Sequence, residues 1–147
     1  TTEHIDAFAK LFKKHIYDWA TCDTFSSKVL TRLIKKDNTF AQPVLAWKDS
    51  TLLWQQRSAC VSFVGLGRHG NHNDEIISIC TSVIYNQERF TQLGVGWVLR
   101  ELSVADLNLA LLFIEKHYDL FSREGLRYAI EKIDSPLRKK ILKGTFH

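Results

Sequence analysis

Apolar residues recur every three to four positions through almost the whole chain, which is the period of an amphipathic helix. The first segment with this pattern spans residues 3–17, and its inner face would carry Ile5, Phe8, Leu11, Phe12 and Ile16. The same period predicts helices over 21–36, 41–47, 51–66, 74–85, 87–102, 104–117, 123–133 and 136–143. Short turns separate these segments and no segment requires a sheet, so the pattern predicts an all-α protein built from paired helices.

Residues that favour helix ends lie between several of these segments. Ser50 can act as the N-cap of the helix that follows it. The Gly- and Asn-rich stretch 67–73 has the composition of a loop, and Asn73 can cap the next helix. The stretch 103–106 has the form of a capping box, and Pro136 lies where proline favours a helix start.

A repeat is visible in two of the helical segments. Trp54-x-x-Arg57 recurs as Trp97-x-x-Arg100, a separation of 43 residues. This falls within the period of about 40–47 residues that HEAT and armadillo units show. Stepping back by the same distance from Arg57 reaches another cation, Lys14. We therefore predict a HEAT-like or armadillo-type α-solenoid of paired antiparallel helices with a concave face.

Composition restricts the class of protein. A chain of 147 residues with 45% hydrophobic and 24% charged residues fits one folded domain over 1–147 and argues against disorder. No run approaches the roughly 20 apolar residues that span a bilayer, and no signal peptide is visible. Three cysteines without a C-x-x-C spacing favour a reducing intracellular compartment, cytoplasm or nucleus. The formal charge of +4 permits nucleic-acid binding without establishing it.

Three short runs combine an aromatic plate with a charge. Trp19 and Asp23 lie one helical turn apart, and each Trp-x-x-Arg run likewise places both side chains on one face of a helix. A carboxylate beside π-faces suits a reaction in which an organic group becomes positively charged. The arginines suit a polyanionic partner.

The order and spacing of these runs resembles the DNA alkylation repair family of HEAT-like glycosylases. That family carries a W-x-x-x-D element, an R-x-A element and a G-W-x-L-R element, matched here by Trp19 with Asp23, by 57–59 and by 96–100. The resemblance extends from about residue 10 to 140. Family members carry several helices before the first element, so the chain resembles the C-terminal two-thirds of the family fold. We accordingly expect an exposed apolar patch at the N-terminal end, covered by self-association or by a separate N-terminal fragment.

The resemblance implies hydrolysis of the N-glycosidic bond of cationic alkylated purines, 3-methyladenine and 7-methylguanine, in duplex DNA. Asp23 would stabilise the cationic sugar and direct the attacking water. Trp19 and Trp97 would press their π-faces on the lesion nucleotide, Arg57 would hold a phosphate, and Arg100 is a weaker candidate for the same contact. Monofunctional hydrolysis is expected over lyase chemistry, because the nearest lysine in that frame, Lys28, lies about 140° around the helix from Asp23.

Each of these residues also has a structural interpretation. Large aromatics usually pack inside a protein, so Trp19 and Trp97 can be core residues. A first-turn aspartate such as Asp23 can simply favour the helix dipole. Arg57 and Arg100 can cover apolar surface with their stems, although the polar neighbours of Arg57 fit a solvent-facing groove equally well. Trp47 and Trp54, which lack a counterpart in the family elements, are expected in the core, or for Trp54 at the groove rim.

The remaining charged residues allow weaker assignments. Lys14 and the run Arg138–Lys140 are candidate DNA contacts, although such a run is usually a solvated helix face. His69 and His72 share a loop, but no carboxylate or cysteine completes a metal set, so neither metal nor cofactor is expected. The resemblance implies duplex DNA containing alkylated bases as the partner, and no membrane partner is expected. A non-catalytic HEAT-like module that binds DNA structures or a protein partner is the alternative function.

Overall fold

The computed structural model describes residues 2–14 and 18–146, and every regular element in those two ranges is a helix. The α-helices, with one π-helical turn (η1) and three short 3-10 segments (η2 to η4), follow in this order: α1 (Thr2–Lys14), α2 (Trp19–Phe25), η1 (Ser26–Leu30), α3 (Thr31–Lys36), η2 (Asn38–Phe40), α4 (Ala41–Leu45), η3 (Ala46–Asp49), α5 (Leu53–Gly67), α6 (Asn73–Val83), α7 (Arg89–Ala105), α8 (Leu107–Lys116), η4 (Tyr118–Leu120), α9 (Arg123–Ala129) and α10 (Ser135–Leu142).

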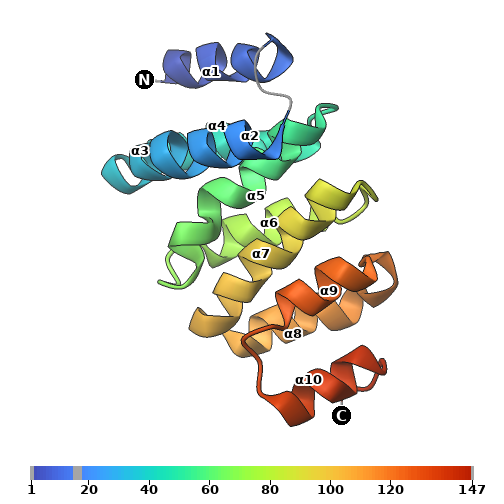
Figure 1. The fold of residues 1–147 in the computed structure, drawn as a ribbon. Helices are drawn as coiled ribbons and strands as arrows, with labels where there is room; N and C mark the ends of the chain where they lie inside the picture. Colours follow the sequence, from blue (N-terminus) through green and yellow to red (C-terminus); the bar gives the residue numbers. More distant parts are fainter. Residues whose placement is uncertain (1, 15–17, 147) are drawn as a thin grey trace.

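The helices stack in chain order, from α1 at one end to α10 at the other (Figure 1). One layer consists of α2, α5, α7 and α9, each packed on the next. The other layer contains α4, α6 and α8, which connect the members of the first layer. This is the all-α solenoid expected from the helical period.

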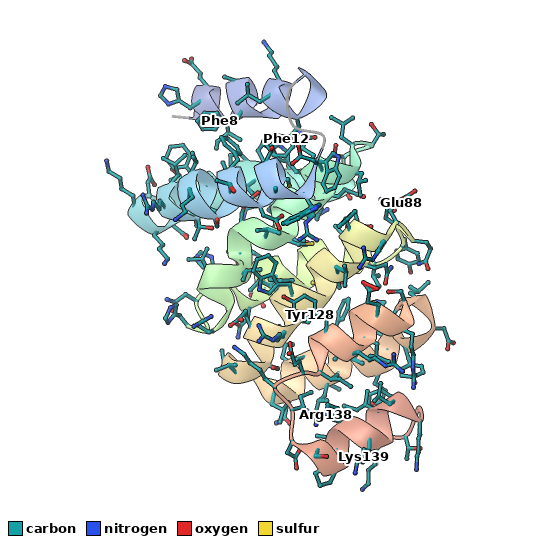
Figure 2. The ribbon with its side chains drawn as sticks, in the orientation of Figure 1. Phe8, Phe12, Glu88, Tyr128, Arg138 and Lys139 are labelled. Atoms are coloured by element: carbon teal, nitrogen blue, oxygen red, sulfur yellow. The ribbon has the colours of Figure 1, made fainter. Side chains whose placement is uncertain are left out.

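The first helix buries its apolar side on this stack. Ile5 and Phe12 are buried, and the rings of Phe8 and Phe12 meet Phe25 edge-on at 5.2 and 5.9 Å between centroids (Figure 2). In the described part of the chain, the exposed large apolar residues all lie outside α1: Trp19, Tyr85, Val104, Leu107 and Leu112. The expected apolar patch on the first helix is therefore wrong for the residues described; Ile16, which was part of that expectation, lies outside them.

The second helical segment differs from the sequence-based expectation in its start and its shape. It begins at Trp19, not at residue 21, because Asp18 caps it by accepting a hydrogen bond from the backbone of Thr21 (2.7 Å). After Phe25 the helix widens into the π-helical turn η1 and then continues as α3. Trp19, which the predicted helix bounds leave outside both segments, thus begins the helix that carries Asp23.

The separation of 43 residues is not the repeat of the helix pairs. α7 begins 36 residues after α5, so the expected period is wrong. Trp97 therefore lies seven residues deeper into its helix than Trp54 does. Seven residues are close to two full turns, so the two tryptophans have nearly the same angular position when counted from the first residue of each helix.

Two expected helix caps are also replaced. α7 runs through Ser103 to Ala105, and Asp106 alone caps α8 by accepting from the backbone of Leu109 (3.0 Å). Ser50 does not cap α5 directly, but accepts from the backbone of Leu52 (3.0 Å) just before it. Within the two described ranges, no helix has the length and apolar content that crossing a bilayer requires.

Candidate functional site

The side chains of Asp23 and Arg57 form one two-pronged ion pair between α2 and α5. Arg57 donates from Nε to Asp23 Oδ1 and from Nη2 to Asp23 Oδ2, both at 2.8 Å. Its Nη1 donates to the backbone carbonyl of Phe90 at the start of α7 (2.7 Å). One guanidinium therefore joins three helices of the same layer.

Arg57 is the more deeply buried partner. Its side chain is 8% exposed and that of Asp23 is 19% exposed. Burial alone would lower the pKa of Arg57, but the hydrogen bonds and the negative charge of Asp23 raise it overall. Because the guanidinium lies deeper than the carboxylate, the negative end of the pair is the end nearer to solvent.

The polar neighbours of Arg57 in the sequence were compatible with a solvent-facing groove, but in the structure the side chain of Arg57 is buried. α5 lies between α2 and α7, so polar side chains on it meet neighbouring helices instead of water. Gln55 and Ser58 are buried as well, and Gln55 donates to the carbonyl of Ala9 (3.3 Å). Direct phosphate binding by Arg57 stays a prediction, and its contacts favour a positioning role.

The helix start explains why Asp23 is available for this pair. Asp18, not Asp23, occupies the N-terminal cap, and its hydrogen bonds with Thr21 lower the pKa of the Asp18 carboxyl. The first turn of α2 contains no acidic residue. Asp23 therefore lies beyond the first turn, and its charge is paired with Arg57. An interaction with the helix dipole is not needed to explain an aspartate at this position.

Aromatic side chains border the ion pair. Trp19, the first residue of α2, is 54% exposed and lies one turn before Asp23. Trp54, one turn before Arg57, is half-buried and packs its ring against Phe90 (5.3 Å between centroids). The guanidinium of Arg57 lies 5.8 Å from the centre of the same Phe90 ring. Trp47 is buried in the core as expected.

A glycine in the run before Trp97 fixes the position of α7 against α9. A Cβ on Gly96 would lie 2.6 Å from the carbonyl oxygen of Gly125 in α9, whereas a Cβ on Gly94 would make an ordinary contact with Arg57 at 3.6 Å. Close approach of α7 to α9 therefore depends on the missing side chain of Gly96. Trp97, half-buried, is carried by this segment about 10 Å along α7 from Phe90, at 1.5 Å per residue.

Arg100 is held away from the Asp23 carboxylate by acidic residues of its own. Its Nε lies 2.9 Å from Glu131 and its Nη1 donates to Glu101 at 3.2 Å. Its guanidinium lies 5.6 Å from the ring centre of Tyr128 on α9 (Figure 2). Of the two predicted arginines, the structure joins Arg57 to Asp23 and places Arg100 in a separate cluster.

Glu101 is the centre of that cluster and was not identified from the sequence. It is only 2% exposed, and it also pairs with Arg68 (2.9 Å) and Lys132 (3.2 Å). The sequence shows only a carboxylate between an arginine and a leucine in a predicted helix, which does not indicate that it is buried or paired. Its cationic partners come from three different parts of the chain, which no local spacing reveals.

The remaining predicted cations lie towards the two ends. Lys14 ends α1, and its side chain lies outside the described residues. Arg138 on α10 is half-exposed and donates to the carbonyls of Glu131 and Ile133 (Figure 2). Up to residue 122 the chain has as many acidic as basic residues, so its whole net charge of +4 belongs to residues 123–147. Lys139 and Lys140 of that segment are exposed.

Of the two histidines in the loop before α6, His69 is exposed and His72 is buried. The ring of His72 lies 5.6 Å from that of Phe63, and its Nδ1 lies 3.7 Å from Glu75. Among the described residues, no three or more His, Cys, Asp or Glu side chains gather into a potential metal site.

The chain is similar to a known family over nearly all its length. The family model described as DNA alkylation repair enzyme matches residues 1–133. No curated protein and no solved structure matches the chain. Since the matched segment contains the Asp23–Arg57 pair and the glycines that carry Trp97, and covers far more than half of the sequence, the chain belongs to the DNA alkylation repair enzyme family.

Proposed function

We propose that this protein is a DNA glycosylase that hydrolyses the N-glycosidic bond of cationic alkylated purines, such as 3-methyladenine and 7-methylguanine, in duplex DNA. The observation that carries the proposal is the Asp23 carboxylate, held at both oxygens by buried Arg57 and still partly exposed. An exposed tryptophan lies one turn before it on the same helix.

The chemistry of such substrates explains why a fixed carboxylate is useful. Alkylation gives the purine a formal positive charge, so the base leaves readily and the main task is to stabilise the sugar as it becomes an oxocarbenium ion. A negative group that is already oriented does this without reorganisation in the transition state. The guanidinium fork supplies the orientation, because both of its contacts to Asp23 are charge-assisted hydrogen bonds of 2.8 Å.

Two lone-pair sites remain on the carboxylate beyond those used by Arg57. Asp23 can thus accept a hydrogen bond from the attacking water and face the sugar with the remaining negative charge. Trp19 would lie against the lesion nucleotide, where a cation–π contact contributes about 0.5–2 kcal/mol. Trp97 would make the same kind of contact further along the layer.

Other cations would bind the duplex away from the lesion. The exposed lysines beside Arg138 concentrate positive charge on α10, and phosphate contacts there would provide sequence-independent affinity. Arg100 and Lys14 remain candidates for such contacts. Lys28 lies on the side of α2 and η1 that carries Ala20 and Thr24, not on the side of Asp23, which supports hydrolysis without a lysine nucleophile.

A non-catalytic DNA-binding module is the second candidate, and one observation favours it. The Asp23–Arg57 pair joins α2 to α5 and through Phe90 to α7, so it has a structural role regardless of any reaction. The two functions predict opposite results for a variant that keeps the shape of Asp23 but removes its charge.

Asp23→Asn is that variant. The amide oxygen can still accept one of the two hydrogen bonds from Arg57, so DNA binding should persist, while release of 7-methylguanine from methylated duplex in single-turnover assays should fall by about a hundredfold or more. Circular dichroism at the assay temperature verifies that the variant is folded. A release rate within about threefold of the wild type would remove Asp23 from the mechanism, and no release by the wild-type chain would favour the non-catalytic module.

A further inference from the structure

Buried hydroxyl groups join the helix of Asp23 to the helix of Arg57 immediately beside the ion pair. Ser26, the first residue of η1, and Ser58, next to Arg57 on α5, are both 0% exposed. Their Oγ atoms lie 2.6 Å apart, and Ser26 Oγ also donates to the carbonyl of Cys22 (2.7 Å). A serine hydroxyl has one hydrogen, so Ser58 must be the donor to Ser26.

The resulting chain of hydrogen bonds runs between the immediate neighbours of the two charged residues. It begins at Ser58, adjacent to Arg57, passes through Ser26, and ends at the carbonyl of Cys22, adjacent to Asp23. A second contact reinforces it, because the Cys22 thiol donates to the carbonyl of Trp54 (3.2 Å). Every connection lies within one residue or one helical turn of the ion pair.

A π-helical turn begins at Ser26. The backbone N–H of Thr31 donates to the carbonyl of Ser26, five residues earlier, which widens the helix by one residue. Serine bonding to the carbonyl four residues before it, as Ser26 does to Cys22, favours such local distortion. Widened turns of this type are frequent at functional sites.

We infer that Ser26 and Ser58 are positioning residues that set the register of α2 against α5 and thereby place the Asp23 carboxylate for the reaction. The inference rests on the proposed glycosylase function. Misplacement of a reacting group by about 1 Å can cost about a hundredfold in rate, so a small change of register at this point has a large effect on the chemical step.

The chain offers a matched structural control on the same pair of elements. Thr31 Oγ1 lies 2.7 Å from the carbonyl oxygen of Ser62 on α5 and 3.1 Å from that of Ser26, and Thr31 is almost as deeply buried as Ser26. Thr31→Val removes these contacts eight residues after Asp23, but it leaves the Ser26 hydroxyl and the backbone bond from Thr31 to Ser26 in place. Ser26→Ala removes a contact three residues after Asp23. Both variants should lose stability, but only Ser26→Ala should affect positioning.

The test measures single-turnover release of 7-methylguanine, affinity for methylated duplex, and thermal stability for Ser26→Ala, Ser58→Ala, Ser26→Ala/Ser58→Ala and Thr31→Val. We expect both single serine variants to slow release by roughly ten- to a hundredfold with affinity within about threefold of the wild type. Thr31→Val should release the base within about threefold of the wild-type rate. The double variant should be more stable than Ser26→Ala, because the Ser58 hydroxyl is then no longer left unpaired, while its release stays slow.

The double variant separates positioning from folding. If its release recovers together with stability, or if Thr31→Val is slowed as much as Ser26→Ala, the serines act only through stability and the inference is overturned. Ser58→Ala keeps the Ser26–Cys22 bond and serves if Ser26→Ala does not fold. Asp23→Asn is measured alongside: a fast Asp23→Asn variant contradicts the proposed function itself, whereas a slow one with wild-type-like serine variants contradicts only the positioning.

Discussion

Replacing Arg57 by methionine tests the role that its contacts assign to it. Methionine retains much of the unbranched stem but removes three charge-assisted hydrogen bonds, two to Asp23 and one to the carbonyl of Phe90. Breaking a buried pair from one side typically costs about 3–5 kcal/mol. Because Asp23 is 19% exposed and water can hydrate it, we expect a loss of about 2–4 kcal/mol, or roughly 5–15 °C in Tm.

A double-mutant cycle isolates the pair from the rest of the substitution. Asp23→Asn, Arg57→Met and the combined variant are compared by urea unfolding at pH 7, with the slope m required to stay constant. The combined variant should be more stable than additivity predicts by about 1–3 kcal/mol, because no charge is left without its partner. Additive losses would show that the pair contributes no coupling and does not hold the carboxylate.

Arg57→Met also distinguishes a positioning role of Arg57 from phosphate binding. If Arg57 binds a phosphate, its substitution lowers the magnitude of the slope of log K against log salt by about one unit, for lesion-containing and undamaged duplex alike. A positioning residue leaves that slope unchanged and reduces the rate of base release. A reduced slope with unchanged single-turnover release would refute the positioning role and restore the phosphate contact predicted from the sequence.

Two further predictions follow from packing and burial. Gly96→Ala should lower the free energy of unfolding by about 1–3 kcal/mol, since its Cβ would lie 2.6 Å from a backbone oxygen of α9. Gly65→Ala, whose Cβ would have its nearest neighbour at 3.6 Å, should raise it by about 0.5–1 kcal/mol. Thermal unfolding measures both variants, and equal effects would contradict the close approach at Gly96. Burial raises the pKa of Cys22 and of Cys60 to about 12, so a thiol reagent at pH 8 should label neither cysteine until the chain unfolds. Since the unfolded thiols ionise near pH 9 and the folded ones do not, stability should decrease as pH rises from about 9 to 12, and rapid labelling of the folded protein would contradict this burial.

Periodicity predicted the fold because nearly every helix here buries an apolar stripe against its neighbours. The two Trp-x-x-Arg runs were also located on helices correctly, and residues three or four apart share a face in any α-helix. The sequence did not predict that Arg57 is buried. Its polar neighbours indicate solvent only when a helix has one side exposed, and α5 has helices of the same layer on two sides.

The parts of the site that the sequence could not predict depend on contacts between distant segments. The carbonyl of Phe90 is a backbone group, and any residue at that position would offer the same acceptor. The buried hydroxyl of Ser26 finds its partner in Ser58, 32 residues later, which no local spacing reveals. The cluster around Glu101 likewise draws Arg68 and Lys132 from separate elements.

The two sides of the proposed site are fixed by different kinds of contact. α7 is located against α9 by close packing at Gly96, where any added atom would meet backbone. α2 and the start of η1 are located against α5 mainly by directional bonds, from Cys22, Asp23 and Ser26. A shift of α2 by one residue would break all three bonds at once, whereas an apolar interface could repack at lower cost. Directional bonds therefore give the Asp23 carboxylate one preferred position, which is the property that stabilising a transient cationic sugar requires.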